Sequence, residues 1–269
     1  MRASILISTL FVVANVAGVA AQDSDDAWLR RCERDNWNDR ESHCVVRVSG
    51  FRPSRGTFSF DPGANGGVRV EGWNRDSVAV HARIRGSADD VADARALAGD
   101  VRIERSGNSV RAEVPGTERR ESISVELVVY LPMRSDLDIE TLNGPLSVYN
   151  VQGQLSLATR NGPLSLEAVG GDVQARTQNG PLTVSLSGNR WRGAGLDAEA
   201  VNGPVTLMIP RSYNAELETG TQNGPVDIDF PVTVTVIGRM TRQINTTLGS
   251  GGPPIRVVTK NGPLRLTRL

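Results

Sequence analysis

Apolar and polar residues alternate strictly after each of six copies of the tripeptide Asn-Gly-Pro in the second half of the chain. Counted from the asparagine, the third and fifth residues are apolar and the fourth is polar or charged, as in Leu146-Ser147-Val148. An alternation of period 2 predicts a β-strand with one buried face, so each tripeptide opens a strand. The six asparagines are Asn143, Asn161, Asn179, Asn202, Asn223 and Asn261.

The tripeptides recur at intervals of 18, 18, 23, 21 and 38 residues. Most repeats also end in an alternating apolar segment, such as Leu155 and Leu157 before Asn161. A repeat of this length with a glycine turn at a fixed position is typical of a stacked array, in which each unit buries its apolar face against its neighbours. The sequence therefore predicts an all-β repeat architecture for residues 143–269.

The proline that follows every Asn-Gly distinguishes between two arrangements of these strands. In a two-residue β-hairpin the residue after the glycine donates its N–H to close the turn, and proline has no N–H. A corner of a parallel β-solenoid tolerates the proline, so we expect such a solenoid, with three short strands in each 18-residue coil. Equivalent asparagines of successive coils then stack into a hydrogen-bonded ladder. An antiparallel meander with two strands per repeat is the alternative.

Two irregularities interrupt the repeat. Residues 187–195 insert a loop that carries Trp191. The interval of 38 residues spans about two repeats and has Gly249-Ser250-Gly251-Gly252-Pro253 where another Asn-Gly-Pro is expected. This interval therefore predicts a degenerate coil.

The first half of the chain is less regular. Residues 44–142 contain several alternating segments, and Asn65-Gly66-Gly67-Val68 resembles the opening of a repeat with glycine in place of proline. An acidic first turn predicts one helix, from Asp89 to Leu97, with Ser87 as its N-cap. Residues 22–43 are polar, and we expect them to be loosely ordered apart from a disulfide.

The beginning of the chain predicts export. Arg2 precedes an apolar stretch that ends in Val19-Ala20-Ala21, which is typical of a secretory signal peptide over residues 1–21. The apolar stretch is short for a bilayer span, and no later segment is long and apolar enough to cross a membrane. We therefore expect an extracytoplasmic protein, periplasmic or at the cell surface, without a transmembrane segment after signal cleavage.

Cys32 and Cys44 are the only two cysteines in the chain. In an exported protein such a pair predicts a disulfide, here within the polar N-terminal segment. Zinc ligation with the neighbouring His43 is the alternative, but two thiols and one histidine at this spacing make a poor zinc site.

The charges and titratable residues point to no particular reaction. The 30 basic and 30 acidic residues are interspersed, so no nucleic-acid partner is expected. His43 and His81 are too few and too far apart for a metal site or a catalytic triad, and we expect His81 to be a surface or satisfied half-buried residue. The sequence thus predicts no enzyme, no metal and no cofactor.

Three features are candidates for binding. Trp191 is either an exposed binding aromatic or a residue that packs over its loop. Asp197 and Glu199 head a group of outward carboxylates that either bind a cation or a polysaccharide or form a solvated strand face. The third feature is an outward row of hydroxyls, which indicates either ordinary strand residues or a flat polar contact surface. The other carboxylates are Glu216, Glu218, Asp227 and Asp229, and the row is Ser147, Ser165, Thr183 and Thr206.

Residues 44–269 resemble the bacterial putative-adhesin family, the exported domains of unknown function built from β-strand repeats. The resemblance rests on Gly66 to Trp73, on Asp76 to Val80 and the helix after it, and on the run of Asn-Gly turns up to Asn261-Gly262. It implies a right-handed β-helix-like solenoid and an extracytoplasmic location. The chain departs from the family pattern in having proline after Asn-Gly.

These observations favour a non-enzymatic scaffold or adhesin-like protein that binds an envelope protein or glycan. A carbohydrate-active β-helix enzyme using the outward carboxylates is one alternative, and a purely structural envelope protein is another. The expected division of the chain is signal peptide 1–21, polar segment 22–43, irregular β portion 44–142 and repeats 143–269.

Overall fold

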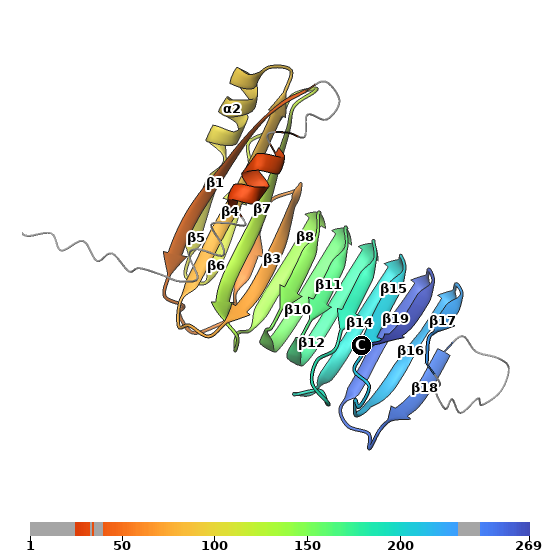
Figure 1. Ribbon diagram of the computed structural model, residues 1–269. Coiled ribbons are helices and arrows are strands. Elements are labelled where there is room, and N and C mark those ends of the chain that lie inside the picture. Colours follow the sequence, from red (N-terminus) through yellow and green to blue (C-terminus); the bar gives the residue numbers. More distant parts are fainter. Residues whose placement is uncertain (1–24, 33, 35–39, 231–242) are drawn as a thin grey trace, which may run out of the picture.

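The computed structural model describes residues 25–32, 34, 40–230 and 243–269, so the expected signal peptide lies outside the described residues. The fold is all-β, as predicted (Figure 1). The largest sheet has ten strands, in the order β1 (Glu41–Phe51), β4 (Val78–Ala88), β7 (Ser122–Pro132), β3 (Gly66–Trp73), β9 (Leu146–Tyr149), β11 (Leu164–Glu167), β13 (Leu182–Ser185), β15 (Val205–Ile209), β20 (Leu264–Arg268) and β17 (Val226–Ile228).

Two further sheets complete the strands. The first has the order β18 (Gln243–Leu248), β16 (Ala215–Asn223), β19 (Pro254–Asn261), β14 (Gly195–Asn202), β12 (Gly170–Asn179), β10 (Gln152–Asn161) and β8 (Leu137–Asn143). The second is small, with the order β2 (Ser59–Asp61), β6 (Ser109–Glu113) and β5 (Arg102–Ser106). Inward side chains of the two large sheets belong to one continuous hydrophobic cluster.

Each Asn-Gly-Pro repeat contributes one strand to each large sheet. In the repeat around Asn161, β10 ends at the asparagine and β11 begins at Leu164 in the other sheet. Neighbouring repeats pair in parallel with equivalent residues opposite one another, so that Asn161 lies beside both Asn143 and Asn179. The antiparallel meander is therefore wrong, and so is the expectation of three strands per coil, because each coil has two.

The backbone of the turns explains the proline. Gly144 N–H donates to the carbonyl of Asn161 in the next coil, and Leu146 N–H donates to the carbonyl of Pro163. The backbone hydrogen bonds between coils thus use the glycine and the residue after the proline as donors. The proline nitrogen is not needed as a donor, so its missing N–H interrupts no bond. The glycine is required by close approach, since a Cβ on Gly162 would lie 2.1 Å from the carbonyl oxygen of Gly144.

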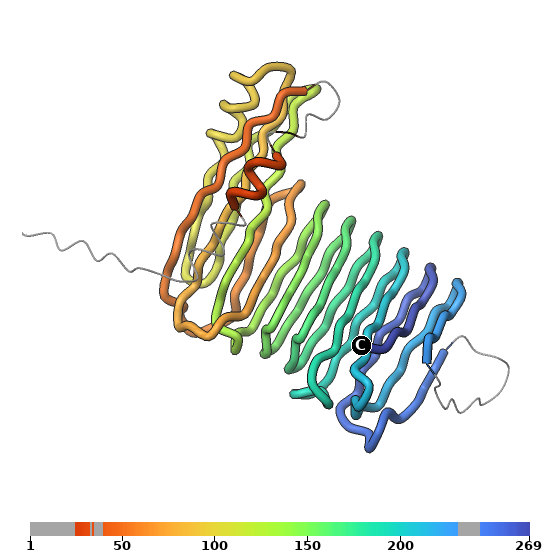
Figure 2. Tube along the Cα trace, viewed as in Figure 1, coloured from red at the N-terminus to blue at the C-terminus, as the bar shows by residue number. Residues whose placement is uncertain are grey.

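The coils do not stack in sequence order. β19 and β20, the last coil of the chain, lie between the Asn202 coil and the Asn223 coil, with parallel pairing on both sides. Figure 2 shows this dark-blue segment between its two neighbours. The expected degenerate coil is wrong for the described part of the interval, because β18 pairs antiparallel with β16 at the end of the stack. From β18 the chain returns inward, because β19 pairs with the other edge of β16.

The first half of the chain extends the same sheets with a different topology. β3 pairs in parallel with β9, with Val68 opposite Leu146, so Asn65-Gly66-Gly67 does occupy the position of a repeat opening. β4 runs antiparallel between β1 and β7. The helix α2 (Val91–Asp100) starts later than predicted, because Asp90, and not Ser87, is the N-cap and accepts the Asp93 N–H.

Residues 25–32 form a helix, which we call the N-terminal helix. The expectation of loose order in this segment is therefore wrong for these residues. The helix packs over β4, where its Asp25 bonds to two strand residues (Figure 1). Within the described residues, no helix is long and apolar enough to cross a membrane.

Candidate functional site

The asparagines at the turns form a continuous ladder along one edge of the stack. The Nδ2 group of Asn161 donates to Oδ1 of Asn143 at 2.8 Å, and Asn179 donates in turn to Asn161 at 2.9 Å. Asn143 donates to Asn65 at 3.2 Å, so the ladder has a seventh member that the tripeptide pattern does not mark. The remaining rungs run from Asn223 to Asn261, then to Asn202 and Asn179.

A second ladder lies inside the first and was not anticipated from the sequence. A threonine two residues before the asparagine is buried and donates its hydroxyl to a turn glycine, as Thr177 does to the carbonyl of Gly162 at 3.1 Å. The signal was present, because threonine precedes five of the six tripeptides at this position and alanine, Ala200, precedes the other. These threonines stabilise the corners and leave no polar group open to a ligand.

Of the outward carboxylates, only Glu216 and Glu218 line a common pocket within the described residues, of about 560 Å³ between β18, β16 and β19, and Arg256 lines it with them. Because β19 inserts between β14 and β16, it places Arg256 between Asp197 and Glu218, at 2.6 Å and 3.4 Å. The neighbouring Glu199 is nearly buried and pairs with Lys260 at 2.8 Å. Asp197, Glu199 and Glu218 therefore each face a basic side chain supplied by the inserted strand.

The charge of Arg256 reflects this pairing. Burial acts to lower the pKa of the guanidinium, but the hydrogen bond and the negative charge of Asp197, with the charge of Glu218, outweigh it and raise the pKa. The cation is thus held in place between the two carboxylates.

The other predicted acids also have partners. Asp227 pairs with Arg265 at 3.1 Å, Asp229 accepts the Arg268 backbone N–H, and Glu216 accepts the Thr247 hydroxyl. Among the described residues, no group of three or more histidine, cysteine or acidic side chains is arranged to hold a metal ion.

Trp191 is buried, with 3% of its surface exposed, and its Nε1–H donates to the carbonyl of Gly171 at 2.9 Å. The alternative in which this side chain packs over its own loop therefore describes it. The interpretation of Trp191 as an exposed binding aromatic is wrong, because its side chain is part of the hydrophobic core.

The hydroxyl row is the most regular outward feature of the largest sheet. Ser147, Ser165, Thr183 and Thr206 lie directly opposite one another on four adjacent strands and are half-buried. Arg69 on β3 continues the row at one end, and Arg265 on β20 continues it at the other.

A buried charged cluster lies under the N-terminal helix. Asp25 accepts from Arg83 Nε at 2.8 Å and lies 2.5 Å from Nδ1 of His81, and all three residues are under 9% exposed. Arg83 also reaches Glu126 at 3.2 Å. His81 is thus a buried, satisfied residue. The sequence did contain a signal for this cluster. His81, Arg83 and Arg85 alternate along β4 and so share one face of the strand, and basic side chains that are buried there require an acidic partner.

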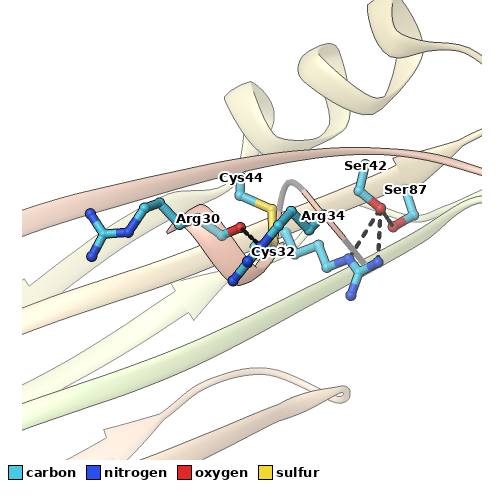
Figure 3. Close-up of a disulfide and its surroundings, with 7 residues drawn as sticks. Arg30, Cys32, Arg34, Ser42, Cys44 and Ser87 are labelled. Atoms are coloured by element: carbon cyan, nitrogen blue, oxygen red, sulfur yellow. Dashed lines mark hydrogen bonds between the residues drawn. A yellow bond between two sulfur atoms is a disulfide. The ribbon is translucent and has the colours of Figure 1, made fainter. Parts of the chain in front are cut away.

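The disulfide between Cys32 and Cys44 is present, as predicted, with Cα atoms 6.4 Å apart. It joins the end of the N-terminal helix to β1 (Figure 3). Next to it, the Ser42 hydroxyl bonds to the Ser87 hydroxyl and accepts from Arg85. The helix is therefore fastened to the sheet by a covalent bond at one end and by the Asp25 cluster at the other.

No family model matches the chain, and no curated protein matches it. Its structural neighbours are putative bacterial adhesins. A putative cell adhesion protein from Clostridium sporogenes is 10% identical, with a TM-score of 0.46 over 84% of this chain and 100% of that chain. A putative adhesin from Bacteroides fragilis is 9% identical, with a TM-score of 0.34 over 84% and 97%. One from Parabacteroides distasonis is 11% identical, with a TM-score of 0.26 over 82% and 97%.

Proposed function

We propose that this protein is a non-enzymatic scaffold of the bacterial envelope, a right-handed parallel β-solenoid that binds an extended partner along the hydroxyl row. The partner is an envelope protein or glycan. The observation that carries the proposal is the row itself, four hydroxyl side chains in register on four adjacent coils.

The row is rigid as well as regular. Ser165 lies between Leu164 and Leu166, whose side chains are buried on the opposite face of the strand, and the other members have the same surroundings. Parallel strands repeat at about 4.8 Å, so the hydroxyls form a flat, evenly spaced series. A polymer with a similarly regular series of polar groups gains several hydrogen bonds there without ordering any part of the protein.

The connectivity of the sequence-ordered coils supports the proposed right-handedness. From β8 to β14 each strand crosses to the other sheet and returns to pair in parallel with the preceding strand of its own sheet, and such crossovers are right-handed in about 98% of cases. The disulfide supports the extracytoplasmic location, because such bonds persist in oxidising compartments such as the periplasm and the cell surface.

The pairing of the acids favours this proposal over a carbohydrate-active enzyme. Asp197 and Glu199 each face a cation from β19, and Glu218, in the pocket beside them, faces Arg256 as well. A purely structural envelope protein remains the competing function, and it differs in requiring no contact along the hydroxyl row.

The test compares two double variants of the mature chain, residues 22–269, immobilised and exposed to solubilised envelope components. Ser165→Arg/Thr183→Arg places two bulky cations in the hydroxyl row. Ser156→Arg/Gln174→Arg places the same groups on exposed positions of the neighbouring coils in the other sheet. Bound protein is identified by mass spectrometry and bound glycan by sugar analysis.

We expect wild type and the Ser156/Gln174 variant to retain the same components, and the Ser165/Thr183 variant to lose most of them. Equal retention by all three proteins, or retention of nothing by wild type, would favour the purely structural function.

A further inference from the structure

A pocket of about 400 Å³ lies where the N-terminal helix meets the first corner of the stack. Such a volume falls within the range of small-molecule sites, roughly 300–1,000 Å³. Three kinds of element contribute to it, namely the N-terminal helix, the strands β4 and β7 beneath it, and the turns that begin at Asn65 and Asn143. The lining includes Trp28, Arg31, Asn65, Arg83, Arg85 and Glu126.

The pocket is basic. Arg31, Arg83 and Arg85 line it, and Glu126 is its one acidic side chain. Arg83 is held in position by Asp25 of the N-terminal helix and by Glu126 of β7. Arg85 is held by the Ser42 hydroxyl. The exposed Arg31 enters from the helix. The surplus of positive charge favours an anionic ligand.

The asparagine ladder ends at the basic pocket, and the dipoles of its amide groups all point the same way. Every rung runs the same way, with the Nδ2 group of one asparagine donating to Oδ1 of the next, from Asn223 at the far end to Asn65. Hydrogen bonds in such a chain polarise one another. Asn65 accepts the last bond through Oδ1, and within the described part of the chain its own NH₂ group donates to no protein acceptor. The donor end of the ladder therefore lies in the lining of the basic pocket.

An aromatic side chain completes the lining. Trp28 is half-buried on the N-terminal helix and contributes an indole surface to the pocket. The Arg83 guanidinium lies over this ring, 5.9 Å from its centroid. An apolar, flat surface beside charged and amide donors suits a ligand with a ring and a carboxylate.

We propose that this pocket binds a uronic acid unit of an acidic glycan. Its carboxylate accepts hydrogen bonds from Arg31 and from the Nδ2 group of Asn65, and its sugar ring packs against Trp28. This site is separate from the hydroxyl row and does not depend on the function proposed for that row.

The experiment uses the mature, disulfide-bonded protein and isothermal titration calorimetry at low ionic strength. The probes are trigalacturonate, the neutral maltotriose and inorganic phosphate. We expect trigalacturonate to bind, with an affinity that falls as salt is added, and neither other probe to reach a tenth of that affinity.

Asn65→Asp is the decisive variant. It keeps Oδ1 as the acceptor for Asn143, so the ladder stays intact, but it replaces the terminal donor by a negative oxygen. We expect the affinity for trigalacturonate to fall by about tenfold or more, since a charge-assisted hydrogen bond becomes a repulsion. Gln178→Glu makes the same amide-to-acid change at an exposed position away from the pocket and controls for net charge.

Arg31→Ala and Trp28→Ala test the other two contacts, and each is expected to weaken binding by about tenfold. The Ser165→Arg/Thr183→Arg variant should bind trigalacturonate as wild type does, which separates this site from the hydroxyl row. The proposal is overturned by absence of trigalacturonate binding, by equal binding of maltotriose or phosphate, or by unchanged affinity in Asn65→Asp and Arg31→Ala.

Discussion

The stack of repeats and the N-terminal region are built from the same sheets but are stabilised in opposite ways. In the stack, the corners repeat the asparagine rung and the glycine backbone contact between neighbouring coils, and all of the Asn-Gly-Pro corners but that of Asn202 add a threonine hydroxyl. In the N-terminal region, single contacts join distant segments, as Asp25 does with Arg83 across 58 residues of sequence. The repeated contacts stabilise the stack as a whole. The N-terminal region, where the repeat ends, instead brings together charged side chains from distant segments.

That difference also locates the two proposed contacts. The hydroxyl row is a product of the repeat, so it is long, flat and uniform. The basic pocket lies where the last rung of the ladder meets the N-terminal helix, and no repeat unit could form it alone. A single substitution in the N-terminal region should therefore have a local effect, whereas one in the stack should also affect the neighbouring coils.

Removing the buried acid should have the largest effect. Asp25→Ala removes the buried anion of His81 and leaves Arg83 with only the less buried Glu126, and breaking a buried ion pair costs about 3–5 kcal/mol. We expect hydrogen exchange to increase in the N-terminal helix and in β4, while the repeats stay protected. Asp138→Ala, at an exposed position on β8, is the control. A uniform increase along the whole chain would mean that the two regions unfold as one unit.

A glycine of the stack should come next. In Gly162→Ala the new methyl group meets the carbonyl oxygen of Gly144, and we expect a loss on the order of 3 kcal/mol in the free energy of unfolding, measured by chemical denaturation. Gly116→Ala is the matched control, because no heavy atom lies within 4 Å of its new Cβ. Equal stability of the two variants would contradict the close stacking of the turns.

A rung of the ladder should have the smallest effect of the three. Asn161→Ala removes one hydrogen bond to Asn143 and one from Asn179, with an expected loss of about 1–2 kcal/mol. Gln178→Ala removes an exposed amide outside the ladder and should be neutral. An unchanged denaturation midpoint in Asn161→Ala would show that the ladder follows from the stacking and does not stabilise it.

Much of the stack could be predicted from the sequence because its determinants are local. The alternation after Asn143 and Asn161 decides which side chains are buried, and the proline after each Asn-Gly excludes a tight hairpin. Equivalent residues must then lie opposite one another, which leads to the asparagine ladder. The disulfide was equally predictable, since Cys32 has only Cys44 as a partner.

The insertion of β19 between β14 and β16 was decided only in the tertiary structure. A coil with the pattern of Leu264 and Leu266 fits against any other coil of the stack, so the sequence does not specify its neighbours. The position of β19 places Arg256 between Asp197 and Glu218. The two carboxylates are therefore paired with a cation.

The contacts of the N-terminal region were also decided only in the tertiary structure, because the sequence does not specify which distant segments become neighbours. His81, Arg83 and Arg85 mark a polar face on β4, but nothing near them in sequence identifies Asp25 as the partner. The helix becomes stable where the sheet buries it, and the disulfide and the ion pair supply contacts that its local sequence lacks. Periodic burial is a local property that the sequence alone determines, whereas the pairing of distant charges exists only once the chain has folded.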